Sequence, residues 1–170
     1  MKKGALISAN HTGFIDPVVV QTQFWYRRTH TVAMKELFET KGKNWFFRKV
    51  LCIPIDRQNM NISSFKDIIS VLKDGKIVAI FPEGQINNDS GTVASFKSGV
   101  ILMALKAKVP IVPIYIAKRE KWYKRQVVVV GDPIQIDENC NLMQINQLSQ
   151  TLHDKEVELM ELYNQRRKKK

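Results

Sequence analysis

The chain has 170 residues, a length typical of one folded domain. Hydrophobic residues make up 44% and charged residues 25%, a composition that excludes a disordered or fibrous chain. The net charge of +11 predicts an anionic partner, which is a nucleic acid, a lipid surface or a phosphorylated ligand. Two cysteines without metal-site spacing predict neither a disulfide framework nor a metal site. No apolar stretch is long enough to span a bilayer, and no signal-peptide pattern is present.

Short apolar runs bounded by turn residues alternate with longer amphipathic segments. In chain order we predict a strand at 6–9, a helix at 17–27, a strand at 31–33, a helix at 36–50, a strand at 52–56, a helix at 62–72, a strand at 77–81, a helix at 98–107, strands at 111–116 and 127–130, and a helix at 142–165. This alternation predicts an α/β fold with a mostly parallel central sheet flanked by helices and a long C-terminal helix. We expect a single domain over 1–170, with a motif-bearing core at 5–116, a C-terminal strand and helix at 126–165, and a basic tail at 166–170.

All three tryptophans stand beside basic residues, in the segments 24–28, 45–49 and 121–125. Tryptophan and tyrosine favour the headgroup level of a membrane, and lysine and arginine attract anionic lipid. The same pairing can stack bases and hold phosphates, and some of these rings fit a protein core equally well. Because no recognisable nucleic-acid-binding motif accompanies the segments, we expect an anionic membrane surface as the partner and no specific nucleic acid.

His11 and Asp16 lie five residues apart, directly after the first predicted strand. Asp16 precedes a proline, which is typical of a helix start with Asp16 as the N-cap. In the alternative interpretation, the loop folds back so that Asp16 contacts one imidazole nitrogen of His11 and stabilises the imidazolium that forms. His11 would then act as a general base toward a substrate hydroxyl. No serine or cysteine nucleophile is evident near the pair, which favours direct attack by that hydroxyl over a covalent enzyme intermediate.

Three further segments place polar residues at the ends of predicted elements. Arg57 follows the third predicted strand, where its guanidinium can bind a phosphate or pair with the neighbouring aspartate. Glu83 and Gly84 form a tight turn with the proline before them. Glu83 can hydrogen-bond a substrate hydroxyl, and the backbone amides of the turn can face an anion. Lys97 stands at the N-terminus of a predicted helix, which favours phosphate. Because the carboxyl ends of parallel strands meet at one edge of a sheet, we expect one shared crevice.

The ordered motifs Asn-His-x4-Asp, Ile-Asp-Arg, Phe-Pro-Glu-Gly, Phe-Lys-x-Gly and Val-Pro-Ile-Val-Pro resemble those of the glycerophospholipid acyltransferases of the lysophosphatidic acid acyltransferase type, over residues 5–116. The resemblance implies that His11 and Asp16 are a catalytic dyad. It further implies that the acceptor is bound by Arg57, Glu83, Gly84 and Lys97. The implied reaction transfers a fatty acyl group from acyl-CoA or an acyl carrier protein to the free hydroxyl of lysophosphatidic acid or a related lysophospholipid. We expect no cofactor, and a peripheral protein at the cytoplasmic face of a membrane.

Two features depart from the family pattern. Many relatives have Thr-Arg-Ser after Phe-Pro-Glu-Gly, where this chain has Gln85-Ile86-Asn87, so the identity of the acceptor stays open. Many relatives also carry a membrane-docking helical segment before the first motif, whereas ten residues precede His11 here. Either the basic-aromatic segments make the membrane contact, or the chain is a truncated member. The alternatives are an acyl-thioester hydrolase, an acyltransferase with another acceptor, or a lipid-binding module without catalysis.

Overall fold

The computed structural model describes residues 4–13, 15–56, 62–82, 97–119, 125–137 and 140–168. Its elements in chain order are β1 (Ala5–Ala9), α1 (Asp16–Gln23), β2 (Thr29–Met34), the 3-10 helix η1 (Lys35–Phe38), α2 (Lys41–Lys49), β3 (Cys52–Ile55), α3 (Ile62–Lys73), β4 (Ile77–Ile80), α4 (Lys97–Ala107), β5 (Ile111–Ile116), β6 (Val128–Val130) and α5 (Leu142–Lys168). Within this part of the chain one sheet has the strand order β3-β2-β4-β1-β5-β6. Strands β1 to β5 are parallel and β6 is antiparallel to β5. The predicted α/β fold with a mostly parallel sheet is confirmed.

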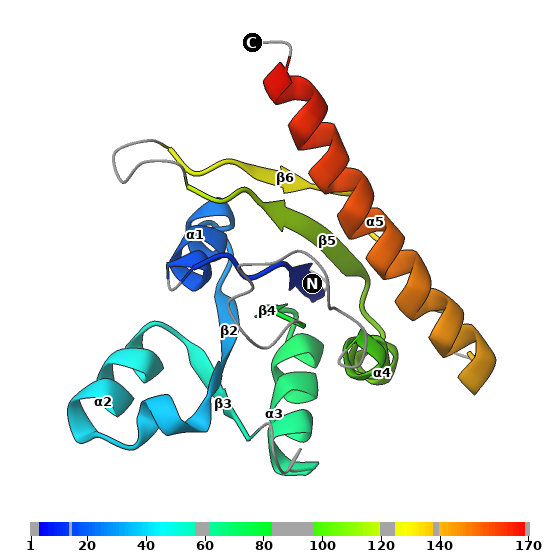
Figure 1. Ribbon diagram of the computed structural model, residues 1–170. Helices are drawn as coiled ribbons and strands as arrows, with labels where there is room; N and C mark the ends of the chain where they lie inside the picture. Colours follow the sequence, from blue (N-terminus) through cyan, green and yellow to red (C-terminus); the bar gives the residue numbers. More distant parts are fainter. Residues whose placement is uncertain are drawn as a thin grey trace.

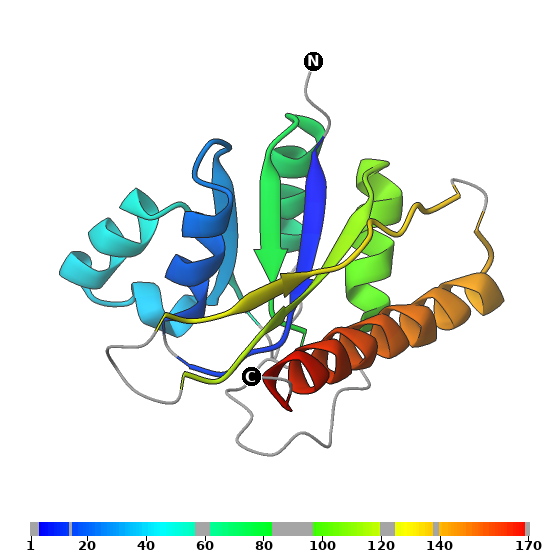
Figure 2. The same ribbon diagram turned by 90° about the horizontal axis from the view of Figure 1, so that it is seen from above.

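Helices cover both faces of the sheet, with α1 above it and α3 and α4 below it in Figure 1. Successive residues of β1 point to opposite faces, so Leu6 joins the core under α3, α4 and α5, and Ile7 joins the core under α1. All four residues of β4 are buried, as expected for a strand covered on both faces. Figure 2 shows the long helix α5 lying obliquely beside β5 and α4.

The element boundaries show where local pattern was insufficient. The predicted helix at 36–50 is wrong, because the chain breaks after η1 and Thr40 adopts extended backbone angles as the N-cap of α2. Helix α1 ends at Gln23 rather than at 27, and the chain then turns so that the Arg27 guanidinium donates to the carbonyl of Gly75 at 2.7 Å. Gly75 itself closes α3 with φ of 77°, a conformation that glycine adopts without steric cost.

Helix α5 carries an apolar stripe that a single carboxylate interrupts. Ile145, Leu152 and Leu159 are buried against the sheet and α4. Glu156 lies between them and accepts a hydrogen bond from the buried Ser8 hydroxyl at 2.6 Å. The interruption is therefore a contact with the central strand β1. Among the described helices, none combines the length and the hydropathy needed to cross a bilayer.

The sheet register defines the edge at which the site is built. Ser8 of β1 pairs with Ile80 of β4, and Ala9 pairs with Ile114 of β5. The residues that follow these three parallel strands therefore emerge side by side at one edge, which we call the carboxyl edge. His11 and Phe81 lie there.

Candidate active site

His11 and Asp16 are brought into direct contact at the carboxyl edge. The Nδ1 atom of His11 lies 2.9 Å from Oδ2 of Asp16. The imidazole is 16% exposed and the carboxylate 1% exposed, so the pair is open on the histidine side only. Since Nδ1 is committed to the carboxylate, Nε2 is the nitrogen able to exchange a proton with a substrate.

The loop between the two residues holds the carboxylate of Asp16. Oδ2 accepts hydrogen bonds from the backbone amides of Thr12 at 2.5 Å and Gly13 at 2.7 Å. The Thr12 hydroxyl donates to Oδ1 at 3.1 Å. The predicted role of Asp16 as a helix N-cap is wrong: the N-cap is Ile15, and the carboxylate points back into the loop. The amides of the loop, rather than those of the helix, satisfy its charge.

These contacts determine the charge state of Asp16. Burial alone would raise the pKa of its carboxyl group, but the hydrogen bonds from His11, Gly13 and Thr12 outweigh burial and lower the pKa below its usual value. Asp16 is therefore a carboxylate at neutral pH. A fixed carboxylate that accepts the Nδ1 hydrogen orients the imidazole and stabilises its protonated form.

The ring of Phe81 stacks on the imidazole of His11. The two ring centroids are 4.6 Å apart with an interplanar angle of 28°, and Phe81 is buried. Phe81 directly follows β4, which neighbours β1 in the sheet. Phe81 is the first residue of the Phe-Pro-Glu-Gly motif, but nothing in the local sequence predicts that it contacts His11. Its ring restricts the tilt of His11 together with Asp16.

The side-chain amides of Asn10 and Gln126 connect the loop that carries the dyad to the end of β5. The side chain of Asn10 donates to the carbonyl of Ile116 at 3.0 Å and accepts from its amide at 2.7 Å, which ties the start of the loop to the end of β5. The Gln126 amide donates to Oδ1 of Asp16 at 3.3 Å and to the carbonyl of Ala117 at 3.2 Å. Gln126 lies 110 residues from Asp16, so no local pattern predicts this contact.

The structure does not describe the side chains of the other predicted site residues. Arg57, Glu83 and Gly84 lie outside the described residues, as does the side chain of Lys97, whose backbone begins α4. Arg57 follows the edge strand β3, and Glu83 follows β4 shortly after Phe81. The aspartate before Arg57, which the sequence offered as an ion-pair partner, has its carboxylate against Lys35.

Cys52 does not have the character of a nucleophile. Burial raises the pKa of its thiol to about 11, so the thiolate is scarce at neutral pH. It begins β3, at the end of the strand opposite the carboxyl edge. Within the described residues no three histidine, cysteine or acidic side chains are grouped as metal ligands.

Two of the basic-aromatic segments expose aromatic rings, one after the end of α1 and one on α2. Trp25 and Tyr26 are 82% and 60% exposed and follow the end of α1, next to the starts of β2 and β4 and so at the edge away from His11. Trp45 and Phe46 are 66% and 51% exposed on α2. The third segment, apart from its last residue, lies outside the described residues.

The Acyltransferase family model matches residues 1–117, more than half of the chain. The chain belongs to the acyltransferase family. The expected family is thus confirmed, and with it the expectation of an acyltransferase.

Individual members of the acyltransferase family are similar over much of the chain. The 1-acyl-sn-glycerol-3-phosphate acyltransferase of Bacillus subtilis (strain 168) is 31% identical over 136 residues, which cover 77% of this chain and 67% of that protein. The probable 1-acyl-sn-glycerol-3-phosphate acyltransferase of Mycoplasma pneumoniae is 29% identical over 153 residues, which cover 75% of this chain and 56% of that protein. The chain therefore spans about half to two thirds of the length of these relatives.

The fold of this acyltransferase family member also matches a solved structure. The crystal structure of the 1-acyl-sn-glycerophosphate (LPA) acyltransferase PlsC from Thermotoga maritima superimposes with a TM-score of 0.67 and 21% sequence identity. The match covers 96% of this chain and 68% of that chain. At this identity the likeness shows a shared fold.

Proposed function

We propose that this family member transfers a fatty acyl group from an acyl thioester, acyl-CoA or acyl carrier protein, to the free hydroxyl of lysophosphatidic acid or a related lysophospholipid. The observation that carries the proposal is the contact between His11 and the buried, hydrogen-bonded carboxylate of Asp16 at the carboxyl edge of the sheet. The curated relatives named above are 1-acyl-sn-glycerol-3-phosphate acyltransferases, which supports the choice of acceptor.

The proposed chemistry is one proton transfer coupled to one displacement. Nε2 of His11 takes the proton of the acceptor hydroxyl while the oxygen attacks the thioester carbonyl carbon. The C–S bond then breaks, and the leaving sulfur takes the proton back from the imidazolium. Asp16 stabilises the imidazolium between these steps. The high pKa of Cys52 supports a direct transfer over an acyl-cysteine at that residue.

The acceptor would be held by the residues that the family resemblance implies. In this proposal Arg57 and Lys97 bind its phosphate, Glu83 binds its glycerol part, and backbone amides around Gly84 stabilise the oxyanion. The strand order supports a site of this extent, because β3 lies three strand spacings from β1, on the order of 14 Å, which suits an elongated acceptor.

We further propose that the protein associates peripherally with an anionic membrane through α2. Trp45 and Phe46 are largely exposed, and Lys41, Lys43 and Lys49 lie on the same short helix. The Lys49 ammonium stands 5.9 Å from the centre of the Trp45 ring. Exposed aromatic rings beside lysines suit an interface of acyl chains and anionic headgroups.

The decisive experiment measures thiol release from a long-chain acyl-CoA on lipid vesicles, with and without lysophosphatidic acid. We expect release that requires the acceptor, with phosphatidic acid formed in equal amount. The His11→Ala variant should lower the rate by about 10²–10⁴-fold because it removes the base. The matched control is His153→Ala on α5, which changes the same residue type away from Asp16.

Other outcomes would contradict particular parts of the proposal. Thiol release without acceptor would indicate a thioester hydrolase. Normal turnover by a folded His11→Ala protein would exclude His11 as the base. If neither acyl-CoA nor an acyl carrier protein thioester is consumed although the protein binds vesicles, the chain is a lipid-binding module.

A further inference from the structure

A groove lies between the β5–β6 pair and the C-terminal part of α5. It is open to solvent and has a volume of about 610 Å³, within the range of ~300–1,000 Å³ typical of small-molecule sites. Apolar side chains form part of its lining, among them Val128, Val130, Leu162 and Tyr163. Strand β6 and the last turns of α5 lie beside each other in Figures 1 and 2.

The charged side chains that line this β6–α5 groove share one sign. They are Lys118, Arg119, Arg125, Arg166 and Arg167. Among the described lining residues none is an aspartate or a glutamate. They come from three separate segments, the end of β5, the start of β6 and the end of α5, so the fold gathers them. Basic side chains converging on one concavity create a potential that attracts polyanions.

The groove adjoins the dyad. Gln126 lines it and also donates to Asp16 at 3.3 Å. Ala117 lines it too, and the residue before it, Ile116, is bonded on both sides to the amide of Asn10, next to His11. Gln126 and the end of β5 therefore contact both the groove and the loop that carries the dyad.

We propose that the β6–α5 groove binds the phosphate-bearing nucleotide end of the coenzyme A donor. The inference rests on the proposed acyl transfer and deepens it by assigning a donor site separate from the acceptor residues. Coenzyme A joins its thioester to several phosphates and an adenine ring through a long neutral arm. The basic rim matches the phosphates and the valine and tyrosine lining matches the adenosine. Gln126, which lines the groove and donates to Asp16, is where the arm would turn toward the dyad.

The shape of the groove favours a nucleotide over the other polyanions. A membrane surface is flat, whereas these basic side chains line a concavity that three segments of the chain form together. Phosphates on a compact ligand can be reached by lysines and arginines from three segments at once. Each such charge-assisted hydrogen bond is strong compared with one between neutral groups.

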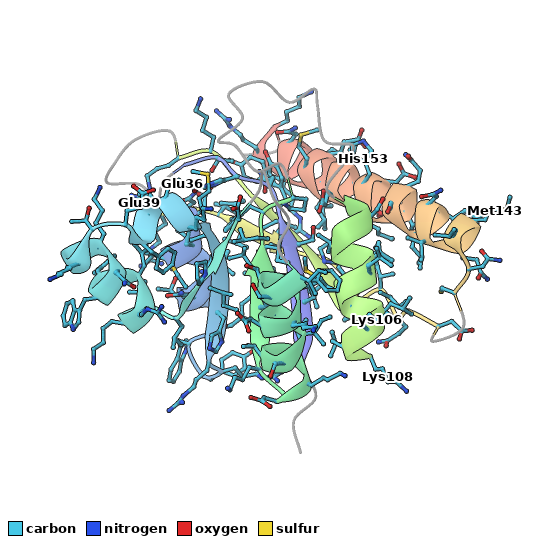
Figure 3. The ribbon with its side chains drawn as sticks, turned by 90° about the horizontal axis from the view of Figure 1, so that it is seen from below. Glu36, Glu39, Lys106, Lys108, Met143 and His153 are labelled. Carbon is cyan, nitrogen blue, oxygen red and sulfur yellow. The ribbon has the colours of Figure 1, made fainter. Side chains whose placement is uncertain are left out.

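The test compares two charge-matched double variants of the whole chain. Lys118→Gln with Arg166→Gln removes two positive charges from the groove. Lys73→Gln with Lys106→Gln removes two positive charges from exposed positions in the last turns of α3 and α4; Figure 3 labels Lys106 on α4. Calorimetric titration with coenzyme A should give a Kd raised about tenfold or more in the groove variant and unchanged in the control.

A truncated donor supplies a second readout. Acyl-pantetheine carries the thioester and the arm but no phosphate or nucleotide. The groove variant should show a raised KM for acyl-CoA with an unchanged kcat, and wild-type kinetics with acyl-pantetheine. The KM for lysophosphatidic acid should not change.

Several results would overturn the groove assignment. Equal coenzyme A affinity in the two double variants would do so, as would an equal loss with acyl-pantetheine. Weaker binding to phosphatidylglycerol vesicles with unchanged coenzyme A affinity would assign the groove to lipid instead. Coenzyme A bound in the groove without any transfer would leave the site standing and refute the proposed function. Acyl transfer by the groove variant with an unchanged KM for acyl-CoA would refute the groove assignment and leave the proposed function standing.

Discussion

The two ends of helix α1 have opposite environments, one buried and one exposed. At its first residue, Asp16 is 1% exposed and its carboxylate is held by the loop before it. Just past its last residue, Trp25 is 82% exposed beside two arginines. Eight helical residues span only ~12 Å, and over this distance the chain passes from the buried His11–Asp16 contact at one edge of the sheet to an exposed basic surface at the other.

The difference has a physical cause. A buried carboxylate must accept hydrogen bonds or become protonated. The groups that donate to Asp16, which include His11 and the loop amides, are therefore held in fixed positions. An exposed indole has no such requirement. We therefore expect substitution of Asp16 to cost activity and stability together, and substitution of the exposed Trp25 to cost neither.

Replacing Asp16 should have the largest effect. Asp16→Asn keeps the shape of the side chain but removes the charge that stabilises the imidazolium and lets the amide favour the wrong tautomer of His11. We expect kcat to fall on the order of 10²–10⁴-fold, measured as acceptor-dependent thiol release. Asp74→Asn, in the exposed turn after α3, is the matched control and should retain wild-type kcat. A fully active Asp16→Asn enzyme would remove Asp16 from the mechanism.

The same carboxylate should make stability depend on acid pH. The pKa of Asp16 is lowered in the folded protein, and an unfolded aspartate has a pKa of about 3.9, so in between the unfolded state binds more protons. The stabilisation is fully present above pH ~4 and is lost as the pH falls through the lower folded value. At pH 7 Asp16→Asn should reduce the free energy of unfolding by about 1–3 kcal/mol. Urea titrations from pH 7 to pH 3 should show this deficit shrinking only below pH ~4; a deficit independent of pH would contradict it.

The start of α1 also shows what the sequence predicts and what it does not. Five residues of separation suffice to predict that Asp16 can reach His11, because the contact is local. The choice between that contact and an N-cap was left open, and it depends on whether the loop amides of Thr12 and Gly13 point inward. Gln126 approaches from 110 residues away, and no periodicity in the chain encodes that approach.

In the fold, too, local features could be predicted from the sequence and distant contacts could not. Apolar runs such as 111–116 predicted strands well, because burial on both faces leaves a signal in a few consecutive residues. The break at Thr40 was missed, although Thr40 and Gly42 are poor helix formers within residues 36–50. The role of Glu156 within the apolar stripe of α5 cannot be predicted from local pattern, since its partner Ser8 lies 148 residues away.

Replacing Phe81 should have an effect on kcat smaller than that of replacing Asp16. Phe81→Leu keeps an apolar side chain but loses the stacking on His11, which is worth about 0.5–1.5 kcal/mol for aromatic pairs. If the ring positions His11 for the transition state, kcat should fall about 2–10-fold. Phe24→Leu is the matched control, because Phe24 packs against the same core at the other end of α1. Equal kcat losses in the two variants would mean that Phe81 acts only through general packing.

The smallest effect is expected at Trp25. Trp25→Ser should change the free energy of unfolding by less than ~0.5 kcal/mol, because the indole is 82% exposed, and thermal or urea denaturation will measure this. It should also leave vesicle-dependent turnover unchanged, since a membrane bound at that edge would hold lipid away from His11. Trp45→Ser on α2 should weaken vesicle binding and vesicle-dependent turnover while sparing activity on a detergent-dispersed acceptor. If Trp25→Ser instead produced the larger loss on vesicles, the membrane would have to meet the amino ends of the strands, and the separation of the two ends of α1 into a reacting and a non-reacting region would fail.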